Sequence, residues 1–327
     1  MNKSETKKTV FPSVSIVIPV FNGLIWLKDS IPQFLLQEYS GEFDVLAIDS
    51  GSTDGSVEFL SNHDSIRIVQ IPQKSFNHGK TRNLALQHSK SDFLLFTVQD
   101  AKPRDAHWMS NMISVARKEN CEAVCGGQAV EPIIQSNPLE WFAPLIKSTY
   151  EVTIHEPADF QRANAHSQCR MCGWDNVNAL YSRHILEEVK FPERLFGEDM
   201  AWAKLALTHG FRICYAKHNK IWHYHFHHPD FTRKRTLAVC FLKHDLFGVL
   251  PKLPARFNAP RTLFSLIFRK HITNPKQLWK WLRHNSIKTK TIRKCIFDFT
   301  TAVQHDRIAL KSLEQELGQK SPMATKQ

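Results

Sequence analysis

Residues 92–100 read DFLLFTVQD, an apolar run followed by polar residues and ending in the carboxylate of Asp100. A short run of consecutive apolar residues is typical of a strand that is buried on both faces in a parallel sheet. Asp100 should then lie just beyond the carboxyl end of this strand, at the edge where open α/β sheets bind ligands. The stretch therefore predicts a parallel α/β sheet, and it makes Asp100 a candidate ligand of a divalent metal ion.

Strands and helices are predicted to alternate on both sides of this stretch. Before it, we expect strands at 14–18, 43–48 and 66–71 and helices at 23–37, 54–60 and 81–87. After it, we expect a strand at 122–130, substrate loops at 131–167, a helix at 199–208 and a strand at 211–216. This alternation indicates a doubly wound, mostly parallel α/β sheet whose strands end along one edge.

Charge is distributed unevenly along the 327 residues, whose formal net charge is +12. Residues 231–327 contain 20 Lys and Arg but 5 Asp and Glu, a net charge of +15, which leaves −3 for the first 230 residues. We therefore expect a flexible N-terminus at 1–12, an α/β domain at 13–230 and a basic helical region at 231–327. Such an asymmetry suggests an acidic catalytic body joined to a segment that meets phosphate-rich partners.

The sequence gives no indication of export or of a membrane span. Pro12 and Ser13 interrupt the apolar stretch that a signal peptide would need, and no run reaches the ~18 apolar residues of a membrane span. Seven cysteines, an odd number, then favour reduced thiols in the cytoplasm. We interpret Cys169 and Cys172, a lone C-x-x-C pair, as ordinary buried residues rather than as a zinc or redox site.

Polar turns follow the first two predicted strands. The first turn places Pro19, Val20 and Asn22 at the expected binding edge. The second turn begins with Asp49, whose carboxylate could accept hydrogen bonds from a ribose or a base. Asp49 and Asp54 could instead cap the turn and the helix that follows it. We favour capping for Asp54 and the ligand contact for Asp49.

The segment FNHGKTRN at 76–83 joins a turn to the start of a helix. It brings His78, Lys80 and Arg82 to the same edge of the sheet. Helix N-termini and arginine side chains are well suited to bind a diphosphate. A basic turn on its own is usually a solvated surface, but its position between the other turns favours a role in binding.

These segments together resemble the inverting family-two glycosyltransferases, and more narrowly their bacterial rhamnosyltransferase-like branch. The resemblance covers about two thirds of the chain and rests on IPVFNG (18–23), DSGSTDGS (49–56), FNHGKTRN (76–83), TVQDAKP (97–103), FGEDMAWA (196–203) and the histidine cluster that begins at His223. It implies the GT-A fold and a nucleotide-diphospho-sugar donor. It also implies a saccharide or lipid-linked saccharide acceptor in cell-surface polysaccharide synthesis, and usually Mg²⁺ or Mn²⁺.

The resemblance also suggests roles for single residues. The family's D-x-D metal motif is degenerate here, because Val98 replaces the first acid and Asp100 alone remains, with Gln99 beside it at the donor site. The E-D motif implies that Asp199 is the general base and that Glu198 orients it or contacts the acceptor. The alternative is that both acids only complement a helix N-terminus, which is common.

Two further segments of the family pattern carry candidate ligands. His223 and His225 match the histidines that could complete the metal site; imidazole accepts transition metals more readily than Mg²⁺. His227 and His228 could be exposed bystanders. Trp174 and Asn176 lie in the segment that the resemblance places at the donor sugar or the acceptor, although Trp174 could equally be a core residue.

The basic region interleaves Lys and Arg with Phe241, Leu242, Leu246, Phe247, Leu263, Phe264, Leu266, Ile267 and Phe268. Helices of this type lie in anionic membrane interfaces, so we expect peripheral attachment to the inner face of the cytoplasmic membrane. Packing onto the α/β domain is the alternative.

We also considered two other functional classes. A nucleic-acid-binding protein would use the same positive charge, but no base-reading module is recognisable. A sugar nucleotidyltransferase would need a cation in the turn after the first strand, and Pro19 to Gly23 contain none.

Overall fold

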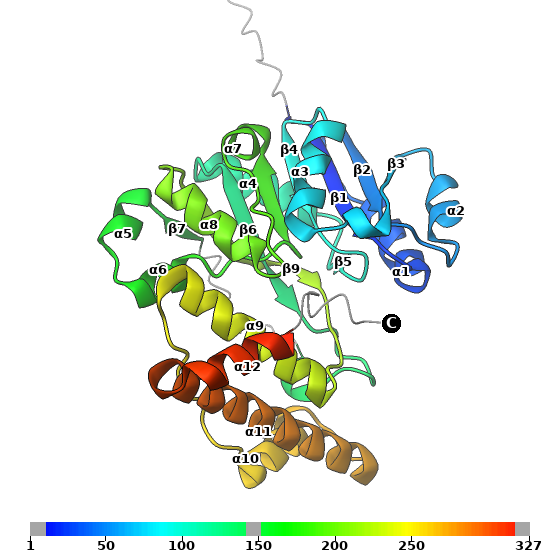
Figure 1. The fold of residues 1–327 in the computed structure, drawn as a ribbon. Coiled ribbons are helices and arrows are strands. Elements are labelled where there is room, and N and C mark those ends of the chain that lie inside the picture. Colours follow the sequence, from blue (N-terminus) through cyan, green and yellow to red (C-terminus); the bar gives the residue numbers. More distant parts are fainter. Residues whose placement is uncertain (1–10, 142–151, 318–327) are drawn as a thin grey trace, which may run out of the picture.

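A mixed nine-stranded sheet forms the centre of the computed structural model, which describes residues 11–141 and 152–317 (Figure 1). Its strands are β1 (Val14–Val20), β2 (Phe43–Asp49), β3 (Ile66–Gln70), β4 (Phe93–Phe96), β5 (Lys102–Pro103), β6 (Ala123–Ala129), β7 (Thr153–His155), β8 (Ala179–Ser182) and β9 (Ile213–Trp222). Their order in the sheet is β3-β2-β1-β4-β8-β6-β9-β5, and β7 pairs with β9.

The strands of the N-terminal half run parallel, as the alternation predicted. β1 pairs in parallel with both β2 and β4. β8 is antiparallel to β4 on one side and to β6 on the other, so β6 again runs parallel to β4. β9 is parallel to β6. The carboxyl ends of β1, β2, β4, β6 and β9 therefore lie at one edge of the sheet.

Helices cover both faces of the sheet, which confirms the doubly wound architecture. On one face lie α1 (Leu24–Leu35), α2 (Ser56–Ser61) and α4 (Trp108–Lys118), packed on Ile16 and Ile18 of β1. On the other lie α3 (His78–His88), α7 (Arg183–Glu188) and α8 (Glu198–Thr208), packed on Val17. Side chains alternate between the faces of a strand, so a single buried strand contributes to both cores.

Helix and strand ends differ from the predictions where side chains bond to the backbone. The helix predicted at 81–87 already begins at His78, because Asn77 accepts hydrogen bonds from Gly79 N and Lys80 N. The helix predicted at 54–60 begins at Ser56, and Asp54 accepts from Ser56 N and from Leu24 N in the capping role that we favoured. The strand predicted at 211–216 extends to Trp222.

The passage predicted to form loops at 131–167 contains short elements in its described part. They are η2 (Pro138–Glu140), β7, α5 (Pro157–Arg162) and the start of α6 (Ala165–Met171). Residues 142–151 lie outside the described residues. A further short helix, η1 (Gln73–Ser75), precedes α3.

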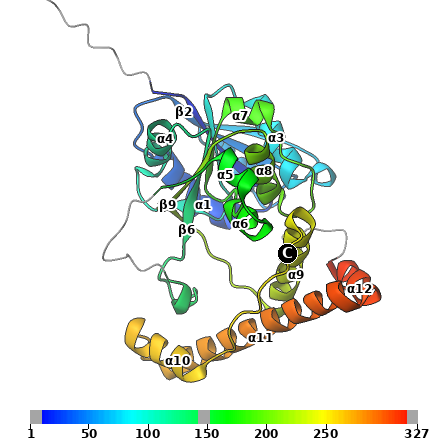
Figure 2. The same ribbon diagram turned by 90° about the vertical axis from the view of Figure 1, so that its left-hand side faces the viewer.

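The C-terminal region is helical, as predicted, and contains α9 (Pro229–Phe247), α10 (Ala259–Phe264), the π-helical turn η3 (Ser265–Arg269), α11 (Pro275–His305) and α12 (Arg307–Leu317). Figure 2 shows α11 extending below the α/β domain with α10 beside its far end. Leu237 and Cys240 of α9 share a separate core with Phe299 of α11. Phe247 at the end of α9 packs into the core of the α/β domain, so α9 joins the two parts.

The expected division of the chain stays a prediction. α9 begins at Pro229, close to the predicted boundary after residue 230. Residues 1–10 of the predicted flexible N-terminus lie outside the described residues. Among the helices of the described residues, none is both long and apolar enough to cross a membrane.

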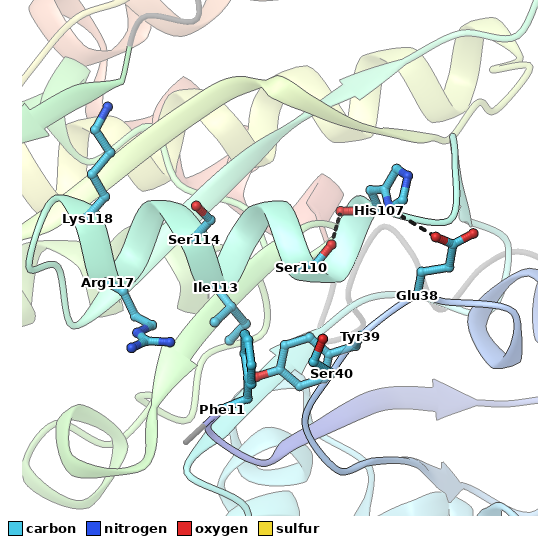
Figure 3. A pocket seen from close by; sticks show the side chains of 10 residues that line it. All are labelled: Phe11, Glu38, Tyr39, Ser40, His107, Ser110, Ile113, Ser114, Arg117 and Lys118. Atoms are coloured by element: carbon cyan, nitrogen blue, oxygen red, sulfur yellow. Dashed lines mark hydrogen bonds and ion pairs between the residues drawn. The ribbon is translucent and has the colours of Figure 1, made fainter. Parts of the chain in front are cut away.

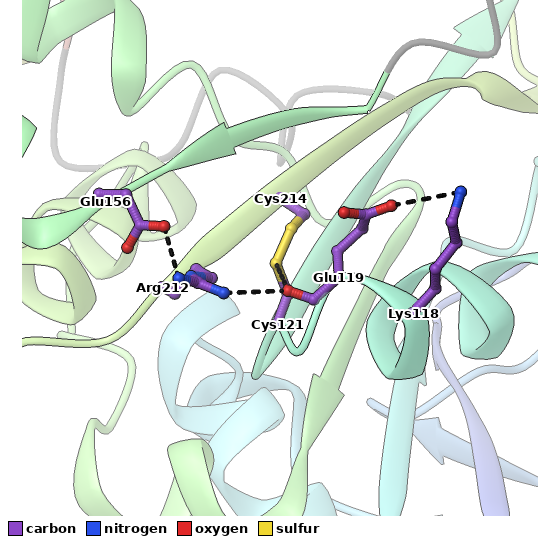
Figure 4. The surroundings of a disulfide bond; sticks show 6 residues. All are labelled: Lys118, Glu119, Cys121, Glu156, Arg212 and Cys214. Carbon is purple, nitrogen blue, oxygen red and sulfur yellow. Dashed lines mark hydrogen bonds and ion pairs between the residues drawn. A yellow bond between two sulfur atoms is a disulfide. The ribbon is translucent and has the colours of Figure 1, made fainter.

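One cysteine pair corrects the expectation that all thiols are reduced. Cys121, just before β6, forms a disulfide with Cys214 of β9 (Figure 4). The two residues are 93 positions apart, but β6 and β9 are neighbours in the sheet. The number of cysteines carries no information about this proximity. Cys169 and Cys172 are free and buried, in agreement with our interpretation.

Candidate active site

A cluster of three potential metal ligands lies at the carboxyl edge of the sheet. The antiparallel pairing of Lys102 in β5 with Trp222 in β9 places Asp100 opposite the residues that follow β9. The Asp100 carboxylate lies 3.6 Å from His223 Nε2 and 3.1 Å from His225 Nε2. The structure thus brings together Asp100, His223 and His225, the three residues that the sequence nominated.

The donor set of this cluster fits a divalent transition metal. One atom of each residue can be chosen so that all three lie within 4.8 Å of one another. Gln128 Oε1 lies 2.8 Å from His223 Nδ1, so it can accept the Nδ1 proton and leave Nε2 free to bind a cation. Two imidazoles and one carboxylate suit Mn²⁺ better than Mg²⁺, which prefers oxygen ligands.

Glu198 and Asp199 begin α8 and have different surroundings. Glu198 Oε1 lies 2.6 Å from Arg82 Nη1, and both side chains are buried. Arg82, which we expected at a diphosphate, is thus held by Glu198. This ion pair joins α3 to the start of α8, so it fixes the position of Asp199.

Asp199 has the strongly perturbed acidity expected of a proton-transfer group. Burial and then the negative charge of Glu198 raise the pKa of its carboxyl group from 3.8 to about 8. A hydrogen bond from Met200 N opposes the shift. The side chain keeps some exposure, so a substrate hydroxyl can reach it. Perturbed carboxyl groups of this kind are enriched at active sites.

Asp175 connects Asp199 electrostatically to the histidine cluster. Its negative charge raises the pKa of Asp199. Burial raises the pKa of Asp175 itself, while a hydrogen bond from Gln128 and the charge of His223 oppose that rise. Asp175 and Gln128 were not among the nominated residues. Asp175 lies between Trp174 and Asn176, which were predicted site residues, so its segment of the sequence could have indicated it. No motif in the sequence indicates Gln128.

The turns after β1 and β2 hold each other in place beside the cluster. Gln99 Oε1 accepts a hydrogen bond from Phe21 N, and Asn22 Oδ1 accepts one from Thr53 N. Asn22 has a φ of 44°, which asparagine tolerates better than most residues. Pro19 and Val20 end β1, opposite Ile48 and Asp49 of β2. These turns shape the surface on which a donor could bind.

Asp49 is fully buried, and its carboxylate accepts hydrogen bonds from Gly51 N and from the hydroxyl and N–H of Ser52. This geometry favours the capping alternative, and contact with a ribose stays a prediction.

On α3, burial lowers the pKa of His78, so its ring is neutral at pH 7. Lys80 is exposed, 3.8 Å from Glu193. It is the cation of this turn that remains accessible to a diphosphate.

The two nominated sugar contacts lie deeper than expected. Trp174 is 3% exposed, packs against Trp202 and donates to Tyr181 Oη. It occupies a core position, which leaves no ring face for a sugar. Asn176 is buried and accepts from Tyr181 Oη, but its Nδ2 has no hydrogen-bond partner within the described part of the chain. A role for Asn176 at the substrate stays a prediction.

Two cavities lie near the sheet, and they differ in their relation to this site. A cavity of about 630 Å³, here called the β6–β9 pocket, is lined by Gln128 and Asp175 and so adjoins the histidine cluster. A larger cavity of about 930 Å³ lies between α4 and the residues that precede β1 and β2 (Figure 3). Because it is at the amino edge of the strands, it is separate from the candidate active site.

Comparison with known proteins agrees with this geometry. Residues 15–188 match the family model described as glycosyl transferase family 2. The chain belongs to this glycosyltransferase family. Because this family consists of glycosyltransferases, the protein is an enzyme. It is therefore assigned neither to the nucleic-acid-binding proteins nor to the sugar nucleotidyltransferases that we considered.

Two curated relatives of this family 2 member are named as O-antigen chain rhamnosyltransferases. RfbN of Salmonella typhimurium is 30% identical over 222 residues, which are 66% of this chain and 68% of RfbN. WbaN of Salmonella anatum is 28% identical over 67% of this chain and 68% of WbaN.

Solved structures confirm the GT-A fold class. TarS 1–349 of Staphylococcus aureus superposes with a TM-score of 0.53 at 15% identity, over 93% of this chain and 90% of TarS 1–349. The mannosyltransferase PcManGT of Pyrobaculum calidifontis, solved in complex with GDP-Man and Mn²⁺, gives a TM-score of 0.52 at 15% identity, over 94% and 81% of the two chains.

Proposed function

We propose that this glycosyltransferase transfers a sugar, with rhamnose the first to be tested, from a nucleotide-diphospho-sugar to a saccharide or lipid-linked saccharide acceptor. The observation that carries the proposal is the position of Asp100, His223 and His225 at the carboxyl edge of the sheet, with Asp175 close enough to interact electrostatically with both His223 and Asp199. The rhamnosyltransferase names of RfbN and WbaN support the choice of sugar.

In the proposed reaction Asp199 accepts the proton of the acceptor hydroxyl, because a protonated hydroxyl is a weak nucleophile. The hydroxyl oxygen displaces the nucleoside diphosphate directly, which inverts the configuration at the sugar carbon. Glu198 and Arg82 act as positioning residues for Asp199. A divalent metal held by Asp100, His223 and His225 would neutralise charge on the departing diphosphate.

Ligand-dependent stabilisation tests this proposal. A ligand that binds only the folded state raises the melting temperature. UDP, GDP and dTDP should be compared, each with MnCl₂, with MgCl₂ and with EDTA. We expect one nucleotide to stabilise the protein with Mn²⁺, and the Asp100→Ala variant to lose the Mn²⁺-dependent part. No stabilisation by any of the three nucleoside diphosphates under any of these conditions would contradict the proposed function.

We further propose that the enzyme binds an anionic membrane through the far end of its helical region. Residues 246–297 contain 12 Lys and Arg and no Asp or Glu. The exposed apolar residues of α10, η3 and the start of α11 are called the apolar tip: Leu263, Phe264, Phe268 and Trp279, which are 37%, 53%, 63% and 68% exposed. Phe241, Leu242, Leu246, Phe247 and Leu266 instead pack inside the protein.

Basic charge beside exposed aromatic rings is complementary to an anionic lipid surface, where each basic residue near the surface contributes ~1 kcal/mol. Co-sedimentation should be strong with vesicles that contain phosphatidylglycerol and weak with pure phosphatidylcholine, and salt should reduce it. Replacing Phe264, Phe268 and Trp279 by Ser should weaken binding. Phe297→Ser is the matched control, since Phe297 is 62% exposed but lies outside the apolar tip. Equal binding to both lipids would refute the proposal.

A further inference from the structure

The β6–β9 pocket combines catalytic surroundings with a basic wall. Its lining includes Asp175 and Gln128, which interact with His223. Its lining also includes Arg170, Lys217 and Lys220. A ligand in this pocket could therefore reach the candidate active site while part of it remains against the three cations.

An irregularity in the sheet directs two of these cations into the pocket. Gly126 pairs with Ala216 and Gly127 pairs with Lys220, so residues 217–219 bulge out of β9. Asn178 Nδ2 holds the bulge by donating to the carbonyl oxygens of Gly127 and Asn219. Bulges beside active sites commonly redirect side chains, and here the bulge places both Lys217 and Lys220 in the pocket lining.

Gly127 provides space for one of the ammonium groups. A Cβ at position 127 would lie 2.5 Å from the carbonyl oxygen of Lys217 and 3.1 Å from Lys220 Nζ. Any side chain at this position would therefore displace the bulge or Lys220. The absence of a side chain at Gly127 therefore leaves room for both the bulge and the Lys220 ammonium group.

The cations of this pocket also repel one another. Burial lowers the pKa of Lys220, and the charges of Arg104 and Lys217 lower it further. Burial and then the charge of Lys217 lower the pKa of His155, which also lines the pocket. An anion in the pocket would relieve this repulsion through charge-assisted hydrogen bonds.

We propose that the β6–β9 pocket binds a phosphate or diphosphate ester of the acceptor, with Lys217, Lys220 and Arg170 as its ligands. This inference rests on the proposed function and specifies its acceptor as an anionic one. The donor diphosphate has a different place, because β4 and β8 separate the turns after β1 and β2 from β6 and β9 in the sheet. The acceptor hydroxyl would then lie between the phosphate site and Asp199.

Calorimetric titration with inorganic pyrophosphate in EDTA tests the inference, because EDTA removes any metal that could bridge pyrophosphate to the histidine cluster. We expect the unmodified protein to bind and the Lys217→Gln/Lys220→Gln variant to bind at least about tenfold more weakly, since each charge-assisted hydrogen bond contributes about that factor. Lys90→Gln, at an exposed lysine remote from the pocket, is the matched control and should bind normally. Equal binding by the double variant would overturn the inference.

Two further measurements separate the possible causes of a negative result. The double variant should retain Mn²⁺-dependent stabilisation by the nucleoside diphosphate that the unmodified protein binds. If the double variant retains nucleotide binding and also binds pyrophosphate as tightly as the unmodified protein, the pocket assignment alone is refuted. If the unmodified protein binds no nucleotide, the proposed function is refuted. Octyl phosphate should bind at least as tightly as inorganic phosphate; rejection of the ester would overturn the assignment to an acceptor.

Discussion

Replacing Asp199 by asparagine tests whether this carboxyl group is protonated in the folded protein. Burial and the charge of Glu198 raise its pKa from 3.8 to about 8. Between these pH values the folded protein keeps a proton that the unfolded chain has released. Because Asp199 ionises first in the unfolded chain, the free energy of unfolding falls as the pH rises from about 4 to about 8. Below about pH 4 both states are protonated and the effect is absent.

The size of the effect follows from the shift. One pKa unit corresponds to about 1.4 kcal/mol, which sets an upper limit of roughly 5 kcal/mol at pH 8. The side chain is partly exposed and lies at the positive end of α8, so we expect about 1–3 kcal/mol. Asparagine cannot ionise, and its side-chain oxygen can still accept the hydrogen bond from Met200 N. Asp199→Asn should therefore stabilise the protein at pH 8 and abolish sugar transfer.

Urea unfolding followed by tryptophan fluorescence at several pH values measures this difference. Glu58→Gln is the matched control, because Glu58 is an exposed acid in the first turn of α2. It should lose about 0.3–1 kcal/mol at pH 8, as expected for an acid that favours a helix N-terminus. If Asp199→Asn loses stability at pH 8 as Glu58→Gln does, Asp199 is a charged helix-capping residue. That result would refute the raised pKa of its carboxyl group.

Three further predictions concern the same site. His223→Ala and His225→Ala should each abolish Mn²⁺ binding measured by calorimetry, and Gln128→Leu should weaken it about 10–100-fold through the lost orientation of His223; unchanged affinity in Gln128→Leu would show that the ring needs no support. Arg82→Met should cost about 3–5 kcal/mol in urea unfolding because it leaves Glu198 buried and unpaired, whereas Arg82→Met/Glu198→Met should recover most of the loss; additive losses would contradict the pairing. The kcat of the unmodified enzyme should rise with pH and level off above about 8, because Asp199 must be ionised to accept a proton; a profile that falls over this range would exclude it as the base.

The α/β domain was predictable because its signals are local. Apolar runs such as 93–96 identify strands that are buried on both faces, and the turn residues between them fix where each strand ends. The starts of α2 and α3 differ from the predicted ones by only a few residues, since each depends on a few hydrogen bonds of one side chain, Asp54 or Asn77. The disulfide between Cys121 and Cys214 was not predictable, because it depends on β6 and β9 being neighbours.

The outcome for the candidate site depends on how buried each side chain is. A motif shows which residue types occur together, but it does not show whether a charge faces solvent or a partner. Arg82 and Glu198 both stand in family motifs, yet they pair with each other inside the protein. Trp174 and Asp175 are likewise neighbours in one segment. Trp174 belongs to the core, whereas Asp175 lines the β6–β9 pocket.

The metal cluster itself depends on a contact that no local pattern contains. Asp100 meets His223 and His225 because a two-residue strand, β5, pairs with the end of β9 across 120 positions of sequence. β9 also carries the bulge that places Lys217 and Lys220 in the β6–β9 pocket. A single strand therefore contributes to the metal cluster at its end and to the pocket wall at its bulge. A change in the register of β9 would displace both at once, whereas the turns after β1 and β2 would keep their own hydrogen bonds.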